Sequence, residues 1–288
     1  MHVVGIMSPM NKLSLAERAR ILACLVEGNS IRATVRMTGF AKNTIVKLLA
    51  EVGAACADYQ DKTLRNLSCK RIQCDEIWSF VYSKERNVTA AKAAPEGAGD
   101  AWTWTAICAD SKLIVSYMVG ERDSKTARAF MQDLAPRLAN RVQLTTDGLR
   151  MYVTAVEAAF HGDIDYAMLE KIYSTTKEDN KGQRRYSPAE CIGTKVSKIN
   201  GDPASDHVNT SYVERQNLTM RMGMRRFTRL TNGFSKKVEN HFYAVALHFM
   251  YYNFGRIHQS LRITPAMEAG ISDHVWSLEE IAVLGVSA

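Results

Sequence analysis

The order of apolar segments between residues 72 and 173 constrains the fold of this chain more than any other feature. Three β-prone runs come first, and antiparallel pairing is the natural outcome for them. A helical run, a short β-prone run, a second helical run and a last β-like run follow. This order predicts an α/β fold with a mixed sheet flanked by helices. The expected strands are 72–81, 102–109, 112–119, 142–146 and 165–173, and the expected helices are 124–138 and 151–160.

Three acidic residues stand where such a fold can bring them together. Asp75 lies within the first expected strand, and Asp147 lies at the carboxyl end of the fourth. Glu214 lies on a helix that we expect to run from His207 past Met222. If the first and fourth strands are neighbours, the two aspartates meet, and a helix packed on the sheet adds Glu214. Carboxylates are hard oxygen ligands of the kind that Mg²⁺ prefers, so the three residues form a candidate metal site.

Each carboxylate also has a simpler interpretation. Asp75 could pair with the neighbouring Lys70 or Arg71. Asp147 could only shape an Asp-Gly turn, and Glu214 could be one more charge on a helix surface. An unpaired carboxylate within an apolar strand is costly to bury, which favours a metal or another cation beside Asp75.

The N-terminal segment has the pattern of three helices. Apolar residues between 15 and 26 share one face, Gly28-Asn29 ends that helix, and Ser30 is expected to cap a second one. After a short turn a third helix is expected at 41–52. This order is typical of a helix-turn-helix motif, although a plain three-helix bundle has the same pattern. The last helix would offer to a DNA groove or its phosphates Lys42, Asn43, Thr44 and Lys47.

A polar stretch without strong periodicity, residues 53–70, separates these helices from the first strand. We place the domain boundary there. The predicted organisation is a helix-turn-helix domain at 1–60 that begins with a disordered extension at 1–9, a linker at 61–70, and a mixed-sheet domain at 71–288 with a helical C-terminal part.

Basic residues accumulate after the last β-like run. Residues 174–206 read as a long irregular insertion that either contacts DNA or is a solvated loop. Beyond it, arginines recur every four residues if the helix of Glu214 continues through Gly223, and the acidic partners that normally alternate with such a stripe are missing. A stripe of this kind suits nucleic-acid phosphates. The candidate DNA-binding residues here are Arg184, Arg185, Arg215, Arg221, Arg225, Arg226 and Arg229.

Composition narrows the class of partner and the compartment. The chain of 288 residues has 37 Lys and Arg against 30 Asp and Glu, and this charge of +7 favours a polyanionic partner. The six cysteines lack zinc or disulfide spacing and read as buried thiols in a reducing cytosol. His241 and His248 also lack a zinc spacing and read as helix-surface or core residues. No apolar run approaches the roughly 20 residues of a membrane span, so we expect a cytoplasmic protein near the chromosome and no membrane partner.

The acidic residues lie in motifs that resemble a known family. The motifs are Asp75-Glu76-Ile77-Trp78-Ser79-Phe80-Val81, Thr146-Asp147-Gly148, and Tyr212-Val213-Glu214-Arg215-Gln216-Asn217-Leu218, followed by Tyr252, Arg256 and His258 in the Tyr-x-x-x-Arg-x-His pattern of integrase-core proteins. They resemble the acidic-triad (DDE) transposases of bacterial insertion sequences, most closely the insertion-sequence-one family. The resemblance covers most of the chain from Asp75 onward. The stretch between Asp147 and Glu214 is longer than in compact members.

This resemblance implies a ribonuclease H-like mixed sheet preceded by an all-α helix-turn-helix domain. It also implies an enzyme that binds the inverted-repeat ends of its element, cuts them and joins them to target DNA. Asp75, Asp147 and Glu214 would be the catalytic residues and would hold two Mg²⁺ ions, for which Mn²⁺ can substitute, with Asp75 bridging the ions. No small-molecule cofactor is implied, and a homo-oligomer on double-stranded DNA is expected.

Other classes of function fit part of the pattern. A structure-selective nuclease on the same fold would cleave without joining. A non-catalytic helix-turn-helix regulator would use the N-terminal helices, but it leaves the acidic series and the arginines after Glu214 unexplained. A decayed transposase is a further alternative, against which the three intact acidic positions argue.

Overall fold

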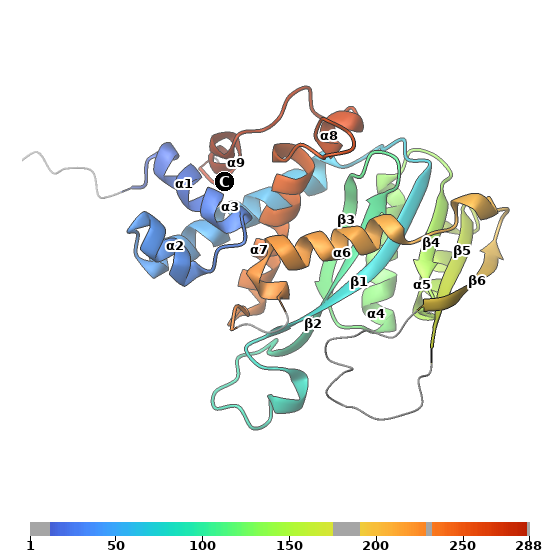
Figure 1. Cartoon of the computed structure of the whole chain (residues 1–288), viewed down its shortest axis with the longest axis horizontal. Coiled ribbons are helices and arrows are strands. Elements are labelled where there is room, and N and C mark those ends of the chain that lie inside the picture. Colours follow the sequence, from blue (N-terminus) through green and yellow to red (C-terminus); the bar gives the residue numbers. More distant parts are fainter. Residues whose placement is uncertain (1–11, 175–190, 229–231, 287–288) are drawn as a thin grey trace, which may run out of the picture.

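The computed structural model describes residues 12–174, 191–228 and 232–286, and its centre is a six-stranded sheet with helices around it (Figure 1). The helices are α1 (Leu15–Val26), α2 (Ile31–Thr38), α3 (Lys42–Thr63), α4 (Ser124–Leu134), α5 (Met151–Phe160), α6 (Ser211–Gly223), α7 (Val238–Met250), α8 (Pro265–Glu268) and α9 (Leu278–Leu284). The strands are β1 (Arg71–Val81), β2 (Gly99–Cys108), β3 (Ile114–Gly120), β4 (Gln143–Asp147), β5 (Asp165–Tyr173) and β6 (Cys191–Asn200).

The sheet has the order β3-β2-β1-β4-β5-β6. β1, β2 and β3 form an antiparallel meander, whereas β4 pairs in parallel with both β1 and β5. The predicted ribonuclease H-like α/β fold, with its first and fourth strands side by side, is therefore confirmed. The register places Cys74 opposite Thr146, so the next residues along the two strands, Asp75 and Asp147, are neighbours.

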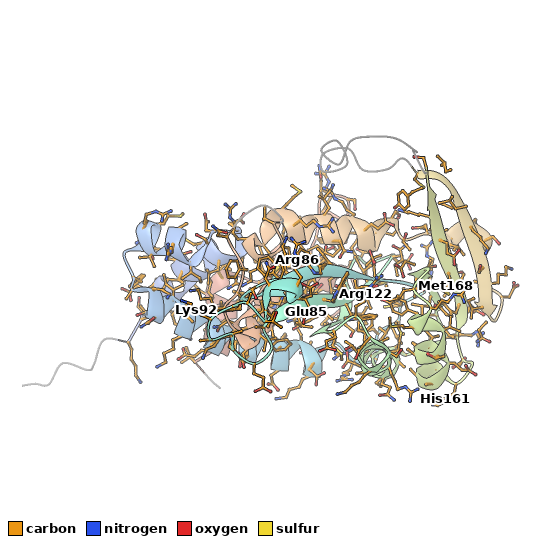
Figure 2. The ribbon with its side chains drawn as sticks, turned by 90° about the horizontal axis from the view of Figure 1, so that it is seen from below. Glu85, Arg86, Lys92, Arg122, His161 and Met168 are labelled. Atoms are coloured by element: carbon orange, nitrogen blue, oxygen red, sulfur yellow. The ribbon has the colours of Figure 1, made fainter. Side chains whose placement is uncertain are left out.

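The two faces of the sheet are covered by different helices. Successive side chains of a strand point to opposite faces, so neighbouring residues of β1 contact different helices. Glu76 contacts Tyr152 of α5 on one face. Gln73 and Asp75 contact α6 on the other face. Figure 2, seen from below, shows the orange ribbon of α6 on one side of the strands and the green helices α4 and α5 on the other.

The third helix is longer than predicted. α3 continues to Thr63 through the polar residues that we expected in a connector, so that part of the prediction is wrong. Its apolar side packs on α7 so closely that a Cβ added to Gly53 would lie 2.5 Å from the Cβ of Tyr243. The buried Gln60 donates to the carbonyl of Ala246 in α7 at 3.1 Å. The buried side chains of α1 and α3 accordingly belong to the same core as those of the sheet.

Part of the predicted irregular insertion is a strand. Residues 191–200 form β6, which pairs antiparallel with β5 at the edge of the sheet. Cys191 on this strand is exposed, in contrast to the five other cysteines, which are buried as expected. The predicted DNA contacts Arg184 and Arg185, like the predicted extension at 1–9, lie outside the described residues.

The predicted arginine stripe does not form as a continuous helix. α6 ends at Gly223, and residues 225–227 form a separate 3-10 turn. In that turn Arg226 is half-buried and donates to the hydroxyl of Ser235 at 2.7 Å. Burial lowers the pKa of Arg226 to about 10, and the hydrogen bond directs its side chain towards Ser235. Arg229 lies outside the described residues.

The helical C-terminal part, which begins with α7, contributes buried side chains to the main apolar core. His241 and His248 are buried on α7, which is one of the two placements expected for them. None of the helices in the described ranges is both long and apolar enough to cross a membrane.

Candidate active site

The three predicted carboxylates line one cavity of about 640 Å³. Asp75 reaches it from β1, Asp147 from the end of β4, and Glu214 from the first turn of α6. Two basic side chains, Arg122 and Lys171, line the same cavity. The strand order thus brings together residues that are far apart in the sequence, as predicted.

Asp75 is held by neutral donors. Its Oδ1 accepts the backbone N–H of Glu76, and its Oδ2 accepts Nδ2 of Asn217 from α6, both at 2.8 Å. Among the described residues it forms no ion pair with Lys70 or Arg71, and Arg71 pairs with Asp110 instead. Burial, followed by the charges of Glu76 and Asp147, raises the pKa of Asp75 to about 7. Its environment therefore disfavours the charged carboxylate unless a cation is beside it.

Asp147 shapes the turn that follows β4 and also faces the cavity. Its Oδ1 accepts the backbone N–H of Leu149 at 3.0 Å. Burial raises its pKa, and the charge of Glu214 raises it further. The turn role that we considered as an alternative is real, and it coexists with a position beside Asp75.

Glu214 is positioned by the packing of α6 on β1. The N-terminus of α6 has no side-chain cap of its own, and Oε1 of the buried Gln73 accepts the backbone N–H groups of Tyr212 and Val213 at 2.9 and 3.2 Å. A strand side chain therefore satisfies two of the free N–H groups of the helix. Glu214 itself forms an ion pair with Lys171 at 2.5 Å, and Thr210 donates to it at 2.6 Å.

Glu76 is a site residue that the prediction missed. Its side chain is only 1% exposed, Arg122 binds its Oε1 at 2.9 Å, and the hydroxyl of Tyr152 donates to its Oε2 at 3.1 Å. Burial raises the pKa of Glu76, and the neighbouring Asp147 raises it further, while Arg122 opposes the shift. A charged residue next to Asp75 in an apolar strand was the available signal.

The donor set fits a hard divalent cation. Ligand oxygens of Asp75, Glu76 and Asp147 lie within 4.8 Å of one another, and Glu214 lines the same cavity. These groups are all carboxylates, the ligands that Mg²⁺ and Mn²⁺ take, and this cluster contains no thiolate or imidazole that would select a softer metal.

The predicted DNA-binding residues lie in two places. On the first turns of α3, Lys42, Asn43 and Lys47 are exposed, and Thr44 is half-buried. On and after α6, Arg215 and Arg225 are exposed and Arg221 is half-buried.

Comparisons with known proteins give structural likenesses only. No family model matches the chain, and no curated protein matches it. One similar solved structure is a piggyBac transposase synaptic complex with hairpin DNA, at 9% identity and a TM-score of 0.41, covering 98% of this chain and 73% of that chain. Another is a Mos1 transposase paired-end complex with the left transposon end, at 10% identity and a TM-score of 0.25, covering 57% of this chain and 62% of that chain. A third is a Mos1 mariner paired-end complex with Mn, at 10% identity and a TM-score of 0.29, covering 84% of this chain and 77% of that chain.

Proposed function

We propose that the chain is a metal-dependent polynucleotidyl transferase, a DNA transposase of the acidic-triad class that resembles the insertion-sequence-one family. The observation that carries the proposal is the convergence of Asp75, Asp147 and Glu214 in one cavity. Burial raises the pKa of both aspartates, so placing these acidic side chains together disfavours their charged forms. A bound cation would remove that cost, which supports a metal site.

In this proposal Asp75, Asp147 and Glu214 hold Mg²⁺ or Mn²⁺, which supplies activation of the attacking hydroxyl and stabilisation of the leaving oxygen. The residues of the chain provide position and charge. Asn217 fixes the direction of the Asp75 carboxylate. Arg122 and Lys171 line the cavity, where they can contact the oxygens of a DNA phosphate.

The ion pair between Lys171 and Glu214 is partly open to solvent, with side chains 30% and 40% exposed. Such a pair contributes little to stability and exchanges partners readily. Binding of a phosphate would draw Lys171 towards the anion and release Glu214 for the metal.

Recognition of element ends is assigned to the N-terminal helices. Lys42, Asn43 and Lys47 are exposed at the start of α3, the end that enters the major groove in helix-turn-helix proteins, with Thr44 beside them. Arg215, Arg221 and Arg225 are the described arginines of α6 and the turn after it that remain candidates for phosphate contacts. A homo-oligomer that holds two element ends completes the proposal.

The test uses a plasmid that carries the DNA flanking the coding region. We expect Mg²⁺-dependent strand cleavage that falls by orders of magnitude in Asp75→Asn, Asp147→Asn and Glu214→Gln, while DNA binding is kept. Glu157→Gln, an exposed position on α5, is the matched control. Wild-type cleavage by all three variants would contradict the proposal.

A second assay separates transposase from nuclease. A pre-cut element end is supplied together with target DNA, and joined products are scored. We expect joining by the wild-type protein. Cleavage without joining would assign the structure-selective nuclease instead.

A further inference from the structure

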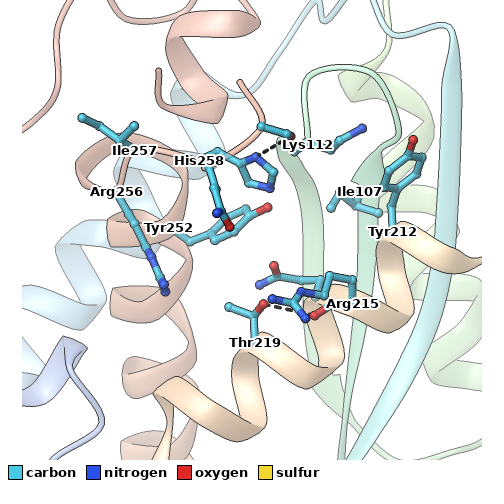
Figure 3. Close-up of a pocket in the computed structure, with 12 residues that line it drawn as sticks. Ile107, Lys112, Tyr212, Arg215, Thr219, Tyr252, Arg256, Ile257 and His258 are labelled. Carbon is cyan, nitrogen blue, oxygen red and sulfur yellow. Dashed lines mark hydrogen bonds between the residues drawn. The ribbon is translucent and has the colours of Figure 1, made fainter. Parts of the chain in front are cut away.

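A second cavity, of about 370 Å³, is lined by α6, by the turn between β2 and β3 and by the segment after α7 (Figure 3). It lies on the other side of α6 from the carboxylates. Thr210 and Glu214 face the first cavity, whereas Tyr212, Arg215 and Gln216 line the second. Positions four apart share one side of a helix, and these two sets differ by about half a turn. The helix α6 is therefore a shared wall between the two cavities.

The second cavity is positively charged. Lys112 from the turn between β2 and β3, Arg215 from α6, and Arg256 and His258 from the segment after α7 line it, and no aspartate or glutamate does. Within the described ranges none of the four forms an ion pair. Burial lowers the pKa of His258, and the nearby charges of Lys112, Arg256 and Arg215 lower it further.

A buried donor in the same cavity lacks an acceptor. Gln216 is 2% exposed and lines the cavity, and its Nε2 has no hydrogen-bond partner in the described structure. An unsatisfied buried amide is costly, so such groups generally have a partner when the protein performs its function. The free N–H₂ group of Gln216 and the surrounding cations could both interact favourably with a bound anion.

The cavity is built on a fixed frame. The buried Asn253, three residues before Arg256, accepts the backbone N–H of Ile114 at 2.9 Å and donates to the carbonyl of the same residue at 3.0 Å. This pairing ties the π-helical turn 251–255 to the beginning of β3, next to Lys112. The backbone segments that carry Lys112 and Arg256 are thus held together before any ligand arrives.

We propose that this cavity binds a backbone phosphate of the DNA strand that enters the carboxylate cavity. An α-helix with its side chains is about 10–12 Å wide, and phosphates of one strand follow each other at about 3.4 Å along the duplex axis. Because the strand also winds around that axis, the two cavities would hold phosphates at most about three nucleotides apart. This inference rests on the proposed function and extends it to Lys112, Gln216, Arg256 and His258.

The test measures binding of a fluorescent DNA duplex in EDTA, across a salt series, by anisotropy. We expect the double variant Lys112→Gln with Arg256→Gln to lower the slope of log affinity against log salt by about 0.9, the value of one lost phosphate contact. The matched control is Lys125→Gln with Arg128→Gln, two exposed residues of α4 on the other face of the sheet, which should keep the wild-type slope. An unchanged slope in the first variant, or an equal loss in the control, overturns the proposal.

Gln216→Leu provides an independent measurement. We expect DNA affinity to fall about tenfold, as for loss of a hydrogen bond to a charged group, with no loss of thermal stability. Unchanged affinity would show that the amide has no role in binding. Thermal stabilisation of the wild type by inorganic phosphate, without the change in DNA salt slope, would assign the cavity to free phosphate and overturn the DNA assignment.

These measurements are made without Mg²⁺ and so are separate from the test of catalysis. Binding that depends on Lys112 and Arg256 in a protein that never cleaves DNA would refute the proposed function and keep this inference. Cleavage by the wild type, together with an unchanged salt slope in the Lys112→Gln and Arg256→Gln double variant, would keep the proposed function and refute this inference.

Discussion

The carboxylate cluster should destabilise the protein when no metal is bound, and Asp75→Asn should reverse this effect. Ligand oxygens of Asp75, Glu76 and Asp147 lie within 4.8 Å. At that separation two charges repel by roughly 3.5 kcal/mol with an effective dielectric constant of about 20. A rise in the pKa of Asp75 from 3.8 to about 7 corresponds to roughly 4 kcal/mol. Because burial is the largest cause of the shift and the repulsion is already contained in it, the two figures are not added, and we expect a gain of roughly 2–4 kcal/mol in Asp75→Asn.

The sign follows from the direction of the shift. A carboxyl whose pKa is higher in the folded than in the unfolded protein opposes folding above the folded pKa, here about 7, and has no effect below the unfolded value of 3.8. The advantage of Asp75→Asn should therefore be full at about pH 8 and shrink as the pH falls towards 4. Asn217 can accommodate the new amide, because its unpartnered Oδ1 can turn towards it.

The assay is urea unfolding followed by circular dichroism, in EDTA and in Mg²⁺. At a Mg²⁺ concentration about 100 times the dissociation constant, the wild type should gain about 2.7 kcal/mol and the variant should gain little. Glu157→Gln should behave as the wild type does in both buffers. The reasoning is refuted if Asp75→Asn is no more stable than the wild type in EDTA at about pH 8, or if Mg²⁺ stabilises both equally.

Three further substitutions test how the frame positions the site. Gln73→Leu should lower the free energy of unfolding in urea by about 1–3 kcal/mol, because it leaves two N–H groups of α6 without their acceptor. It should also reduce cleavage more than DNA binding. Equal losses of cleavage and binding would mean that the helix keeps its place. Gly53→Ala should lower the free energy of unfolding by about 1–3 kcal/mol, since its Cβ would meet Tyr243. The control Gly193→Ala on β6 should change it by no more than about 0.5 kcal/mol. Similar losses in both variants would contradict the close packing of α3 on α7. Asn253→Leu should lower the unfolding free energy by about 2–5 kcal/mol, because it leaves a buried N–H and a buried carbonyl of β3 unpaired, and an unaffected midpoint would refute that pairing.

The sheet could be predicted from sequence because its pattern is local. Each strand is an apolar run with its own turn signals, and the order of the runs matches that of a ribonuclease H-like fold. The position of Asp147 beside Asp75 followed once the first and fourth strands were taken as neighbours, as in that fold. The division into domains at 61–70 stays a prediction. The buried side chains of the N-terminal helices belong to the same apolar core as those of the sheet, so the packing does not mark a boundary there.

The missed features depend on contacts between distant segments. The continuation of α3 is stabilised by Gln60, whose amide donates both to Cys56 within the helix and to Ala246 in α7. β6 is largely exposed, and within the described ranges it pairs with β5 alone, so its residues lack the apolar alternation of a half-buried strand. Arg226 is half-buried and bonded to Ser235 because the chain turns after Gly223, which a regular four-residue spacing of arginines does not reveal.

The alternation of a strand separates the roles of Asp75 and Glu76. Because adjacent side chains point to opposite faces, Glu76 is directed into the buried face, where Arg122 neutralises its charge and Tyr152 binds its second oxygen. In the described part of the chain, the hydrogen bonds to Asp75 and Asp147 come from neutral donors, so a cation in the cavity would be needed to stabilise their negative charges. Glu76 is therefore better suited to hold Arg122 at the cavity than to bind metal itself, which agrees with the proposed set of two aspartates and Glu214.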